Sequence, residues 1–252
     1  MAALPTVWFY TDFGFEGPYL GLMKAALLAE CPAARVTNLM ADAPRFRPRP
    51  AGVLLAALVR WLPRDALVVG VVDPGVGGER RPLLVEVDGR RFVGPDNGLF
   101  SAVLQGGRRC RAWRIDPSPF RLSESFHGRD LFAPAAGRLL AERSLPLTEL
   151  DPGQLEGRYW PVELAEVIYI DGFGNAVTGL SGDAVDPLLF LEVCGRRLPN
   201  ARTFSEVPPG TPFWYVDSLG LVEVAVNQGR ADRFLDLEVG SPVRLCRHAP
   251  RP

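Results

Sequence analysis

The sequence predicts two domains, a layered α/β domain over residues 1–157 and a small all-β barrel or sandwich over residues 158–252. Three observations support this division. Strand-like and helix-like segments alternate through the first 150 residues, which is typical of α/β layers. Short apolar runs separated by turn residues follow, with little helical periodicity, which is typical of all-β domains. Between the two, residues 145–157 carry four prolines and glycines and predict a connecting loop.

In the first domain, apolar runs and proline positions define the elements. The run Ala66–Val72 is the most hydrophobic and suits the centre of a parallel sheet that is covered on both faces. Asp88 and Gly89 form the strongest hairpin signal of the chain. Pro18 and Pro32 bracket the first helix, because proline is tolerated in a first turn and ends a helix elsewhere. The expected strands are 7–10, 36–40, 66–72, 82–87 and 91–93, and the expected helices are 18–30, 51–62 and 130–142.

The second domain is expected to consist of short strands. They cover residues 162–170, 176–180, 188–193, 213–216, 221–226 and 243–246. Short strands at regular spacing with turn residues between them favour a small barrel or sandwich.

The composition is that of an ordinary globular protein, with 47% hydrophobic and 23% charged residues. A net charge of −1 argues against a general nucleic-acid binder, which would carry a basic surface. No apolar run reaches about 18 residues, so no transmembrane helix is expected. The first residues show no basic segment followed by a long apolar stretch. We therefore expect no signal peptide and a cytoplasmic protein.

The rare residues exclude several chemistries. The four cysteines are far apart and form no C-x-x-C pair, and the two histidines belong to no metal-binding motif, so no metal site is expected. Lys24, the only lysine, follows no phosphate-binding glycine motif, which excludes the P-loop. It is more simply interpreted as a solvated helix residue than as a Schiff-base lysine. His248 lies near the end of the chain and is expected to be solvated, which leaves His127.

Three clusters of aspartate and glycine follow expected strands. They are Thr11–Gly14, Asp73–Gly78 and Gly94–Gly98. Ligands of open α/β sheets bind outside the carboxyl ends of the strands. Aspartate and glycine also simply make turns, and for one cluster alone that would be the better interpretation. Several such clusters at strand ends favour a binding site.

Asp12 and His127 are the first candidates for a function. A carboxylate such as Asp12 can accept hydrogen bonds from both hydroxyls of a ribose. His127 stands just before the helix expected at 130–142, with Asp130 as its candidate N-cap. The residues alone leave a catalytic and a structural role open for His127. Gly172–Gly174 follows a strand but matches only half of a dinucleotide fingerprint.

Six segments form an ordered set of motifs that spans nearly the whole chain. They are T-D-F-G at 11–14, V-V-D-P-G-V-G-G at 71–78, F-V-G-P-D-N-G-L-F at 92–100, F-H-G-R-D-L-F-A-P-A-A at 126–136, I-D-G-F-G-N at 170–175 and D-S-L-G-L-V-E-V-A-V-N-Q-G at 217–229. Together they resemble the S-adenosylmethionine (SAM) hydrolase family, also called SAM hydroxide adenosyltransferases. These proteins are relatives of the SAM-dependent chlorinase and fluorinase.

The resemblance implies a fold and an assembly. The fold would be an N-terminal Rossmann-like three-layer α/β domain followed by a C-terminal β-barrel domain. The protein would be a homotrimer that holds SAM between the N-terminal domain of one subunit and the C-terminal domain of its neighbour. No cofactor is implied, because SAM is itself the substrate.

The resemblance also implies roles for ten residues. The water-handling triad falls on Asp73, Arg80 and His127, and the ribose-binding aspartate falls on Asp12. The other substrate contacts fall on Asp171 for the methionine, Asn175 for the adenine, Ser218 for the methionine end, Glu223 and Asn227 near the adenine and substrate face, and Phe46 as an aromatic near the ribose or adenine. The chain departs from the family at Val36–Leu39, where relatives often carry I-T-H, and at Arg47, where they usually carry an acidic residue.

The implied activity is hydrolysis of SAM to adenosine and L-methionine. The sulfonium already activates C5′, but the attacking water needs a base, and the sequence leaves open which triad member takes the proton. Two alternatives remain. One is a SAM-dependent halogenase, although halogenases lack this triad. The other is a SAM- or adenosine-binding protein without turnover.

Overall fold

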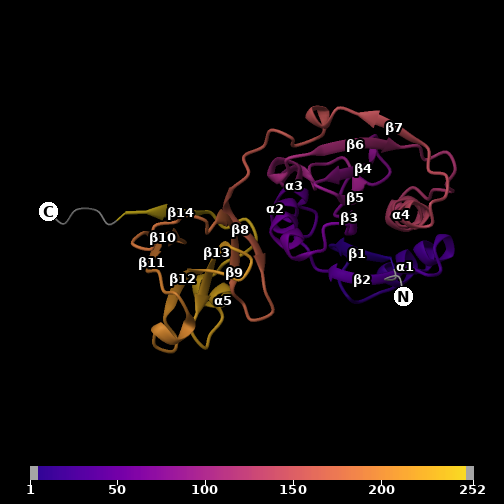
Figure 1. Ribbon diagram of the computed structural model, residues 1–252. Helices are drawn as coiled ribbons and strands as arrows, with labels where there is room; N and C mark the ends of the chain where they lie inside the picture. Colours follow the sequence, from indigo (N-terminus) through magenta and orange to yellow (C-terminus); the bar gives the residue numbers. More distant parts are fainter. Residues whose placement is uncertain (1–4, 248–252) are drawn as a thin grey trace. The chain divides into compact units, whose positions relative to one another are not determined.

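The computed structural model describes residues 5–247, and the chain divides into two compact units, Met1–Trp160 and Pro161–Pro252 (Figure 1). The first four residues, where no signal peptide is expected, and His248 lie outside the described residues. Within the described residues, no helix combines the length and the apolar character needed to span a membrane.

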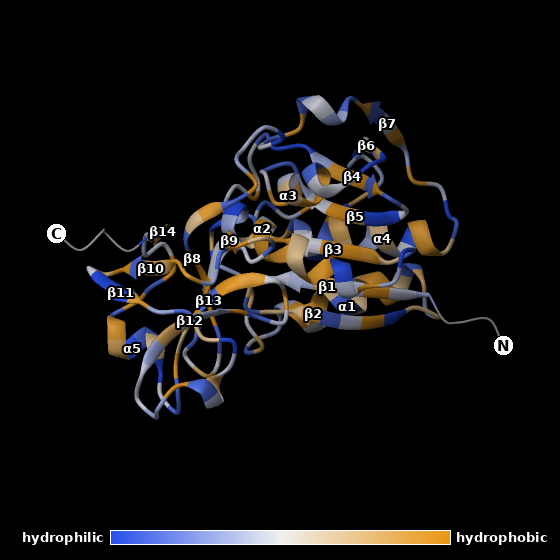
Figure 2. Ribbon diagram, turned by 60° about the vertical axis from the view of Figure 1, so that its left-hand side comes forward, coloured by the Kyte–Doolittle hydropathy of each residue, from blue (hydrophilic) through white to orange (hydrophobic). Residues whose placement is uncertain are grey.

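Unit 1 is built on a seven-stranded sheet with the strand order β2-β1-β3-β5-β4-β6-β7. The first four strands in this order run parallel, and the last three pair antiparallel. They are β1 (Thr6–Thr11), β2 (Arg35–Met40), β3 (Leu67–Val71), β4 (Pro82–Val87), β5 (Arg90–Pro95), β6 (Cys110–Ile115) and β7 (Leu147–Leu150). Every residue of β3 is buried, as expected for the central strand, and Figure 2 shows β3 mainly in the colour of hydrophobic residues.

Helices cover both faces of this sheet and make unit 1 the predicted three-layer domain (Figure 1). They are α1 (Tyr19–Glu30), α2 (Pro48–Leu58), α3 (Ser101–Gly106) and α4 (Ala133–Leu140). Helices α2 and α3 share a core with one face of the strands, which includes Leu55 and Val68. Helices α1 and α4 share a core with the other face, which includes Leu27 and Val69. Successive residues of a strand point to opposite faces, so Val68 and Val69 belong to different cores.

The chain order leaves an opening at the carboxyl ends of β1 and β3. From β1 the chain runs through α1 to β2 on one side, and then through α2 to β3 on the other side of β1. Where the strand order reverses in this way, α/β proteins bind ligands outside the strand ends. The clusters that begin at Thr11 and Asp73 follow these two strands and therefore flank the opening.

Local sequence patterns predicted some helices, strands and turns correctly and missed others. Strands β4 and β5 form the predicted hairpin, with Asp88 and Gly89 both at positive φ in its turn. The loop predicted for 145–157 is wrong, because β7 pairs there with β6 and a 3₁₀ turn follows at Pro152–Gln154. Strand β7 lies at the sheet edge with mostly exposed side chains, so no hydrophobic alternation marks it. Helix α3 and strand β6 were not predicted.

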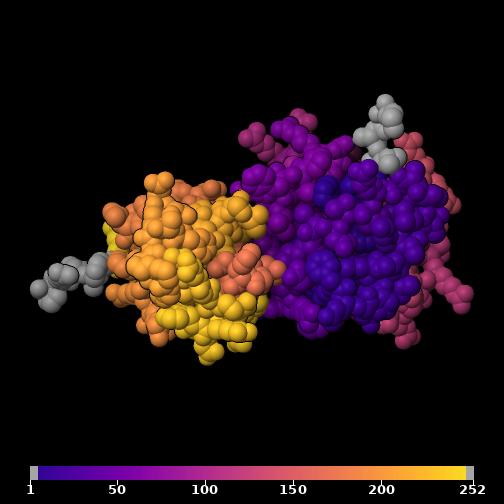
Figure 3. All heavy atoms as spheres, turned by 90° about the horizontal axis from the view of Figure 1, so that it is seen from below, coloured from indigo at the N-terminus to yellow at the C-terminus, as the bar shows by residue number. Residues whose placement is uncertain are grey.

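Unit 2 consists of two antiparallel sheets with the orders β11-β10-β14 and β12-β13-β9-β8. Their strands are β8 (Leu164–Ile170), β9 (Ala176–Ser181), β10 (Phe190–Val193), β11 (Arg196–Leu198), β12 (Pro212–Val216), β13 (Leu221–Val226) and β14 (Val243–Cys246). Single bridges join the sheets, from Glu166 to Pro242 and from Asn200 to Trp214. The seven strands thereby close into the predicted small barrel, whose orange to yellow atoms form one close-packed body (Figure 3).

Unit 2 has a core of its own. Trp214, Val167, Leu191 and Val224 are each at most 1% exposed and pack inside the barrel. Helix α5 (Ala231–Leu235) contributes Ala231 and Leu235 to the same core. This helix and strand β11 are too short to show a periodic pattern, which is why they were not predicted.

Candidate active site

Four of the predicted site residues line one pocket in unit 1. The pocket has a volume of about 630 Å³, and Asp12, Phe46, Asp73 and His127 all contribute to its wall. These residues come from the ends of β1 and β3 and from the segments before α2 and α4. A volume of this size lies in the range of small-molecule sites, about 300–1,000 Å³. The opening predicted from the strand order is therefore a ligand-sized pocket.

Asp12 presents a partly engaged carboxylate to this pocket. Its Oδ2 accepts a hydrogen bond of 3.0 Å from the backbone N–H of Phe46. Burial raises the pKa of Asp12, and the Phe46 N–H and the charge of Arg45 oppose that rise. Phe46 has a positive φ of 58°. Its backbone N–H donates to Asp12, while its ring, on a side chain that is 73% exposed, lines the pocket. Asp12 keeps spare lone pairs for ligand hydroxyls.

Asp73, Arg80 and His127 form one connected group. Arg80 Nε donates to both carboxylate oxygens of Asp73, at 3.0 and 2.9 Å, and Arg80 Nη2 donates to Asp73 Oδ2 at 2.5 Å. The same Nη2 donates to His127 Nδ1 at 2.9 Å. The side chains of Arg80 and Asp73 are only 10% and 4% exposed. The triad implied by the family resemblance is thus assembled in space, with the arginine at its centre.

The loop between Asp73 and Arg80 is held close to the segment that leads to His127. Gly77 lies in this loop at φ of 81°, and a Cβ there would come within 2.4 Å of the Glu124 carbonyl oxygen. Only glycine permits both this backbone conformation and this approach. On its other side, the Arg80 guanidinium lies 5.5 Å from the ring centre of the buried Phe132.

His127 begins a π-helical segment, Gly128–Phe132, that continues into α4. Such segments occur frequently at functional sites. Asp130 lies inside the segment, so its predicted role as an N-cap is wrong. Its Oδ2 accepts from the N–H and the hydroxyl of Ser123 at 2.8 and 2.5 Å. Burial opposes the ionised form, but hydrogen bonds from Arg129 and Ser123 outweigh it and lower the pKa of Asp130 to about 2.

The surroundings of His127 favour its neutral form. The residue is 9% exposed, and burial is the main cause that lowers its pKa. The positive charge of Arg80 acts in the same direction, whereas Asp73 and Asp130 oppose it. A ring with a lowered pKa is neutral at pH 7.

The third cluster, Gly94–Gly98, is structural. Asp96 pairs with Arg81 and accepts a hydrogen bond from the Glu156 backbone N–H at 2.9 Å. Asn97 donates to the Val72 carbonyl at 2.9 Å. These bonds tie the end of β5 to its neighbours, so the turn interpretation holds for this cluster.

An aromatic group that the sequence analysis did not single out forms part of the pocket wall. Phe13, Tyr19 and Phe126 contact one another with ring centres 5.4–5.9 Å apart. Phe13 directly follows Asp12 in the sequence, and Phe126 directly precedes His127. This adjacency to two candidate site residues could have predicted that both rings lie at the pocket. Aromatic faces of this kind attract cations.

In unit 2, Asp171 and Asn175 close the loop between β8 and β9. The two carboxylate oxygens of Asp171 accept from the N–H and the side-chain amide of Asn175, at 2.9 and 3.1 Å. Gly174 has φ of 89°, which this tight loop requires. Phe173 at its tip is 80% exposed. The two hydrogen bonds therefore hold two predicted binding residues against each other.

Glu223 is a buried carboxyl group on β13. It is 4% exposed and pairs across the strands with Tyr215 on β12, whose hydroxyl donates to Glu223 Oε2 at 2.8 Å. Burial raises the pKa of Glu223 to about 7, and the charges of Asp217 and Asp171 act in the same direction. Burial raises the pKa of Tyr215, and the carboxylates of Glu223, Asp217 and Asp171 act in the same direction. These four side chains form an acidic cluster, of which Tyr215 and Asp217 were not predicted.

The other two predicted residues of unit 2 flank β13. Ser218 lies in the turn Asp217–Gly220 and so adjoins the acidic cluster. Asn227 donates its side-chain amide to the Val207 carbonyl at 2.7 Å and its N–H to the Thr211 carbonyl at 3.1 Å. Asn227 is therefore held against the loop before β12.

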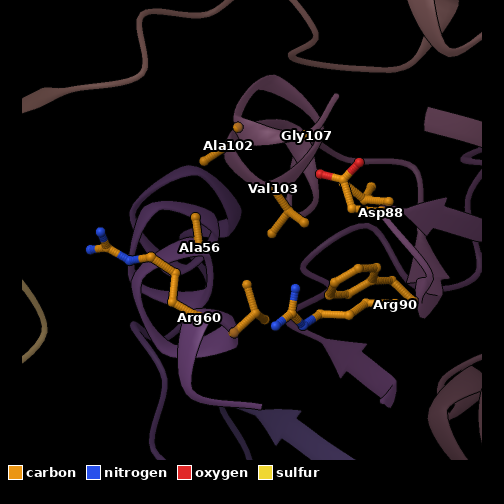
Figure 4. A pocket seen from close by; sticks show the side chains of 11 residues that line it. Ala56, Arg60, Asp88, Arg90, Ala102, Val103 and Gly107 are labelled. Atoms are coloured by element: carbon orange, nitrogen blue, oxygen red, sulfur yellow. The ribbon is translucent and has the colours of Figure 1, made fainter. Parts of the chain in front are cut away.

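A second pocket of unit 1 contains none of the predicted site residues. It has a volume of about 170 Å³ and lies between α2, α3 and the β4–β5 hairpin (Figure 4). Arg60, Asp88 and Arg90 surround an apolar floor there. Arg90 donates to the Leu62 carbonyl at 2.8 Å, and two backbone N–H groups engage Asp88. This volume is below the usual range for ligand sites.

By fold and site, the protein is a two-unit α/β protein with a small-molecule pocket at the switch point of its sheet. The N-terminal domain of the SAM hydroxide adenosyltransferases matches residues 7–149, and their C-terminal domain matches residues 165–244. The chain belongs to the SAM hydroxide adenosyltransferase family, which confirms the resemblance seen in the sequence.

Relatives and solved structures agree with this assignment. Proteins named (R)-S-adenosyl-L-methionine hydrolase are 41% identical in Thermus thermophilus, over 95% of this chain and 98% of theirs, and 36% identical in Salinispora arenicola, over 97% and 99%. The crystal structure of an uncharacterized conserved protein from Thermotoga maritima has a TM-score of 0.84 at 28% identity, over 95% of this chain and all of that one. That of a conserved hypothetical protein from Thermus thermophilus has a TM-score of 0.77 at 40% identity, over 96% and 100%.

Proposed function

We propose that this protein hydrolyses S-adenosyl-L-methionine to adenosine and L-methionine. The observation that carries the proposal is the connected group of Asp73, Arg80 and His127 at a ligand-sized pocket, in a chain whose relatives are named (R)-S-adenosyl-L-methionine hydrolase. Their name specifies one configuration of the sulfonium, and we extend that configuration to the substrate of this chain.

The reaction suits the side chains that line the pocket. The oxygen of a water molecule bonds to C5′, the C5′–S bond breaks, and its electron pair stays on sulfur, so that methionine leaves as a neutral thioether. One proton of the water is released in the process. A general base for that proton contributes typically about 10²–10⁴-fold. The chemistry calls for no metal, cofactor or covalent nucleophile, because the sulfonium already activates the carbon.

In unit 1, Asp12 would bind the ribose hydroxyls and Phe46 would contact the ribose or adenine. The carboxylate lone pairs that the Phe46 N–H leaves open support the first assignment. The position of Phe46 on the pocket wall supports the second. The aromatic group of Phe13, Tyr19 and Phe126 would favour the sulfonium cation, which strengthens binding of the substrate.

In unit 2, the acidic cluster suits the cationic end of the methionine. Asp171 and Ser218 would contact the methionine, and Asn175 would contact the adenine, as in the family resemblance. Glu223 and Asn227 would border the adenine and substrate face. Asp171 and Asn175 are hydrogen-bonded to each other, which supports the proposal that both contact the same substrate molecule.

We further propose a homotrimer in which unit 1 of one subunit and unit 2 of its neighbour share each substrate. The division of the proposed contacts between the two units supports this assembly, and a repeated head-to-tail contact can close a ring of three. In this proposal the predicted domains 1–157 and 158–252 are the two halves of the shared site. We also propose a cytoplasmic location, and the four free cysteines are in keeping with a reducing compartment.

The proposed activity is tested with the purified protein and the separate (R) and (S) sulfonium forms of SAM. We expect adenosine and methionine from the (R) form, identified by chromatography. In ¹⁸O-labelled water the label should enter the 5′-hydroxyl of adenosine. The same products in chloride buffer would exclude the halogenase alternative.

Two other outcomes are informative. Accumulation of 5′-chloro-5′-deoxyadenosine in chloride buffer would show a halogenase. Tight SAM binding without any product would show a binding protein without turnover.

A further inference from the structure

The contact with Arg80 fixes the tautomer of the neutral His127 ring. Nδ1 lies 2.9 Å from Arg80 Nη2, and a guanidinium has donors only, so Nδ1 is the acceptor and the ring proton is on Nε2. The only lone pair of the neutral ring is therefore the one that accepts from Arg80.

The charges around the ring stabilise this neutral tautomer. Arg80 places its positive charge beside Nδ1. The carboxylates that face the ring are those of Asp73 and Asp130, and each is already paired, with Arg80 and Arg129 respectively. In this tautomer Nδ1 accepts from Arg80 and Nε2 carries the proton, so the ring has no lone pair open for a proton from water.

Asp73 is differently placed. Its Oδ1 receives one hydrogen bond, from Arg80 Nε, whereas its Oδ2 receives two. A carboxylate oxygen has two lone pairs, so Oδ1 keeps one open. Asp73 also lines the pocket. It therefore combines a fixed orientation with a vacant acceptor position at the site of reaction.

We propose that Asp73 takes the proton of the attacking water and that His127 is a positioning residue, which holds Arg80 and through it the Asp73 carboxylate. This inference rests on the hydrolysis proposed above. In the step, one O–H bond of water breaks and its proton goes to Asp73, the oxygen bonds to C5′, and the C5′–S electron pair goes to sulfur. Asp73 then returns the proton to solvent.

Two substitutions of His127 distinguish positioning from proton transfer. In His127→Asn the side-chain oxygen takes the place of Nδ1 and can still accept from Arg80. In His127→Gln the oxygen lies one bond farther out, in the place of Nε2. Positioning through Nδ1 predicts a kcat for His127→Asn about 10- to 100-fold above that of His127→Gln, the effect of one hydrogen bond to a charged group.

The other outcomes are equally definite. A general base at His127 predicts that both variants lose about 10²–10⁴-fold alike, which would overturn the inference. Asp73→Asn should lose activity to at least that extent, and full activity of Asp73→Asn would also overturn it. Adenosine affinity and thermal unfolding show whether each variant is folded. Failure of the wild type to form adenosine from SAM would instead refute the proposed hydrolysis.

The tautomer is measured directly by ¹⁵N NMR of histidine-labelled full-length protein. The chain has only two histidines, so the signals that His127→Asn removes belong to His127. We expect a protonated Nε2 and an unprotonated Nδ1 at pH 7. A protonated Nδ1, or a charged ring, would overturn the assignment independently of the kinetics.

Discussion

Glu223 is held where its charge is disfavoured. Burial in the barrel and the neighbouring Asp217 and Asp171 raise its pKa from 4.5 to about 7. A raised pKa means that the folded protein binds the proton more tightly than the unfolded chain. The resulting stabilisation is complete below the unfolded pKa and is lost as the pH rises through the folded pKa. The window of this loss is pH 4.5 to about 7.

This reasoning predicts the behaviour of Glu223→Gln. Glutamine can still accept from the Tyr215 hydroxyl but cannot ionise. At pH 5 the variant should unfold near the temperature of the wild type, and at pH 8.5 it should unfold at a higher temperature. The difference between the two pH values corresponds to at most about 3 kcal/mol. Thermal unfolding followed by circular dichroism measures it.

Glu149→Gln is the matched control for this experiment. Its side chain is 70% exposed and only its solvent-exposed ion pair with Arg111 would be lost, so the pH dependence of stability should stay close to that of the wild type. Equal pH profiles for Glu223→Gln and the wild type would show that Glu223 ionises normally.

Asp12 is predicted to recognise the ribose. Asp12→Ala should weaken adenosine binding by at least about tenfold, because hydrogen bonds to a charged group contribute about 1.5–3 kcal/mol each. For the wild type, 2′-deoxyadenosine should bind more weakly than adenosine. For Asp12→Ala that difference should largely vanish, since the partner of the 2′-hydroxyl is gone. Calorimetry measures the affinities of both proteins for both nucleosides. If Asp12→Ala still binds adenosine more tightly than 2′-deoxyadenosine by the wild-type factor, Asp12 is not part of the ribose site.

Some contacts of the candidate site were predictable from the sequence and others were not. Asp12 and Asp73 each follow an apolar run, and the rule that ligands bind at strand ends brings them together correctly. His127 lines the same pocket and is linked to Asp73 by Arg80, and no spacing in the sequence expresses that contact. Tyr215 meets Glu223 because β12 pairs with β13 in one particular register. Such register-dependent contacts are absent from local sequence patterns.

At the scale of elements, the triad depends on two loops that touch. The loop after β3 carries Asp73 and Arg80, and the segment before the π-helical turn carries His127. Gly77 sits where they meet, against the Glu124 carbonyl. Gly77→Ala should separate the loops and lower kcat by at least about tenfold, since small displacements of catalytic groups are costly. Adenosine affinity should change little, because Asp12 lies at the end of β1.

Gly75→Ala in the same loop is the control. Its Cβ would meet only Asp73 Oδ1, at 3.9 Å, which is ordinary contact, and its φ is not positive. Steady-state kinetics of both variants should therefore show a loss for Gly77→Ala and near-normal turnover for Gly75→Ala. Equal activity of the two would mean that the loop contact does not position the triad.

Secondary-structure elements were predicted correctly where the pattern that defines them lies within a few neighbouring residues. The burial of β3 and the Asp88–Gly89 hairpin were both correctly predicted, because hydrophobic runs and turn residues act within a few residues. Strand β7 depends instead on pairing with β6, a partner more than thirty residues away. Its exposed edge position gives it no pattern of its own.

At the scale of the molecule, the proposed substrate contacts are divided. The triad and Asp12 belong to unit 1, and Asp171 and Asn175 belong to unit 2. Two arrangements could complete the site, one within a chain and one between neighbouring subunits of the proposed trimer. The two arrangements predict different activities for a mixed oligomer that is assembled from two inactive variants.

Co-expression of Asp73→Ala with Asp171→Ala distinguishes the two arrangements. Each variant alone should be inactive, because every site lacks either the triad or a methionine contact. If subunits share sites, a mixed trimer contains one site that combines the intact unit 1 of one chain with the intact unit 2 of its neighbour. Random assembly in equal amounts would give about a quarter of wild-type activity per site. If each site lies within one chain, every site carries a substitution and mixing restores nothing. Light scattering must show a trimer in the same preparation, and an active monomer would contradict the shared site directly.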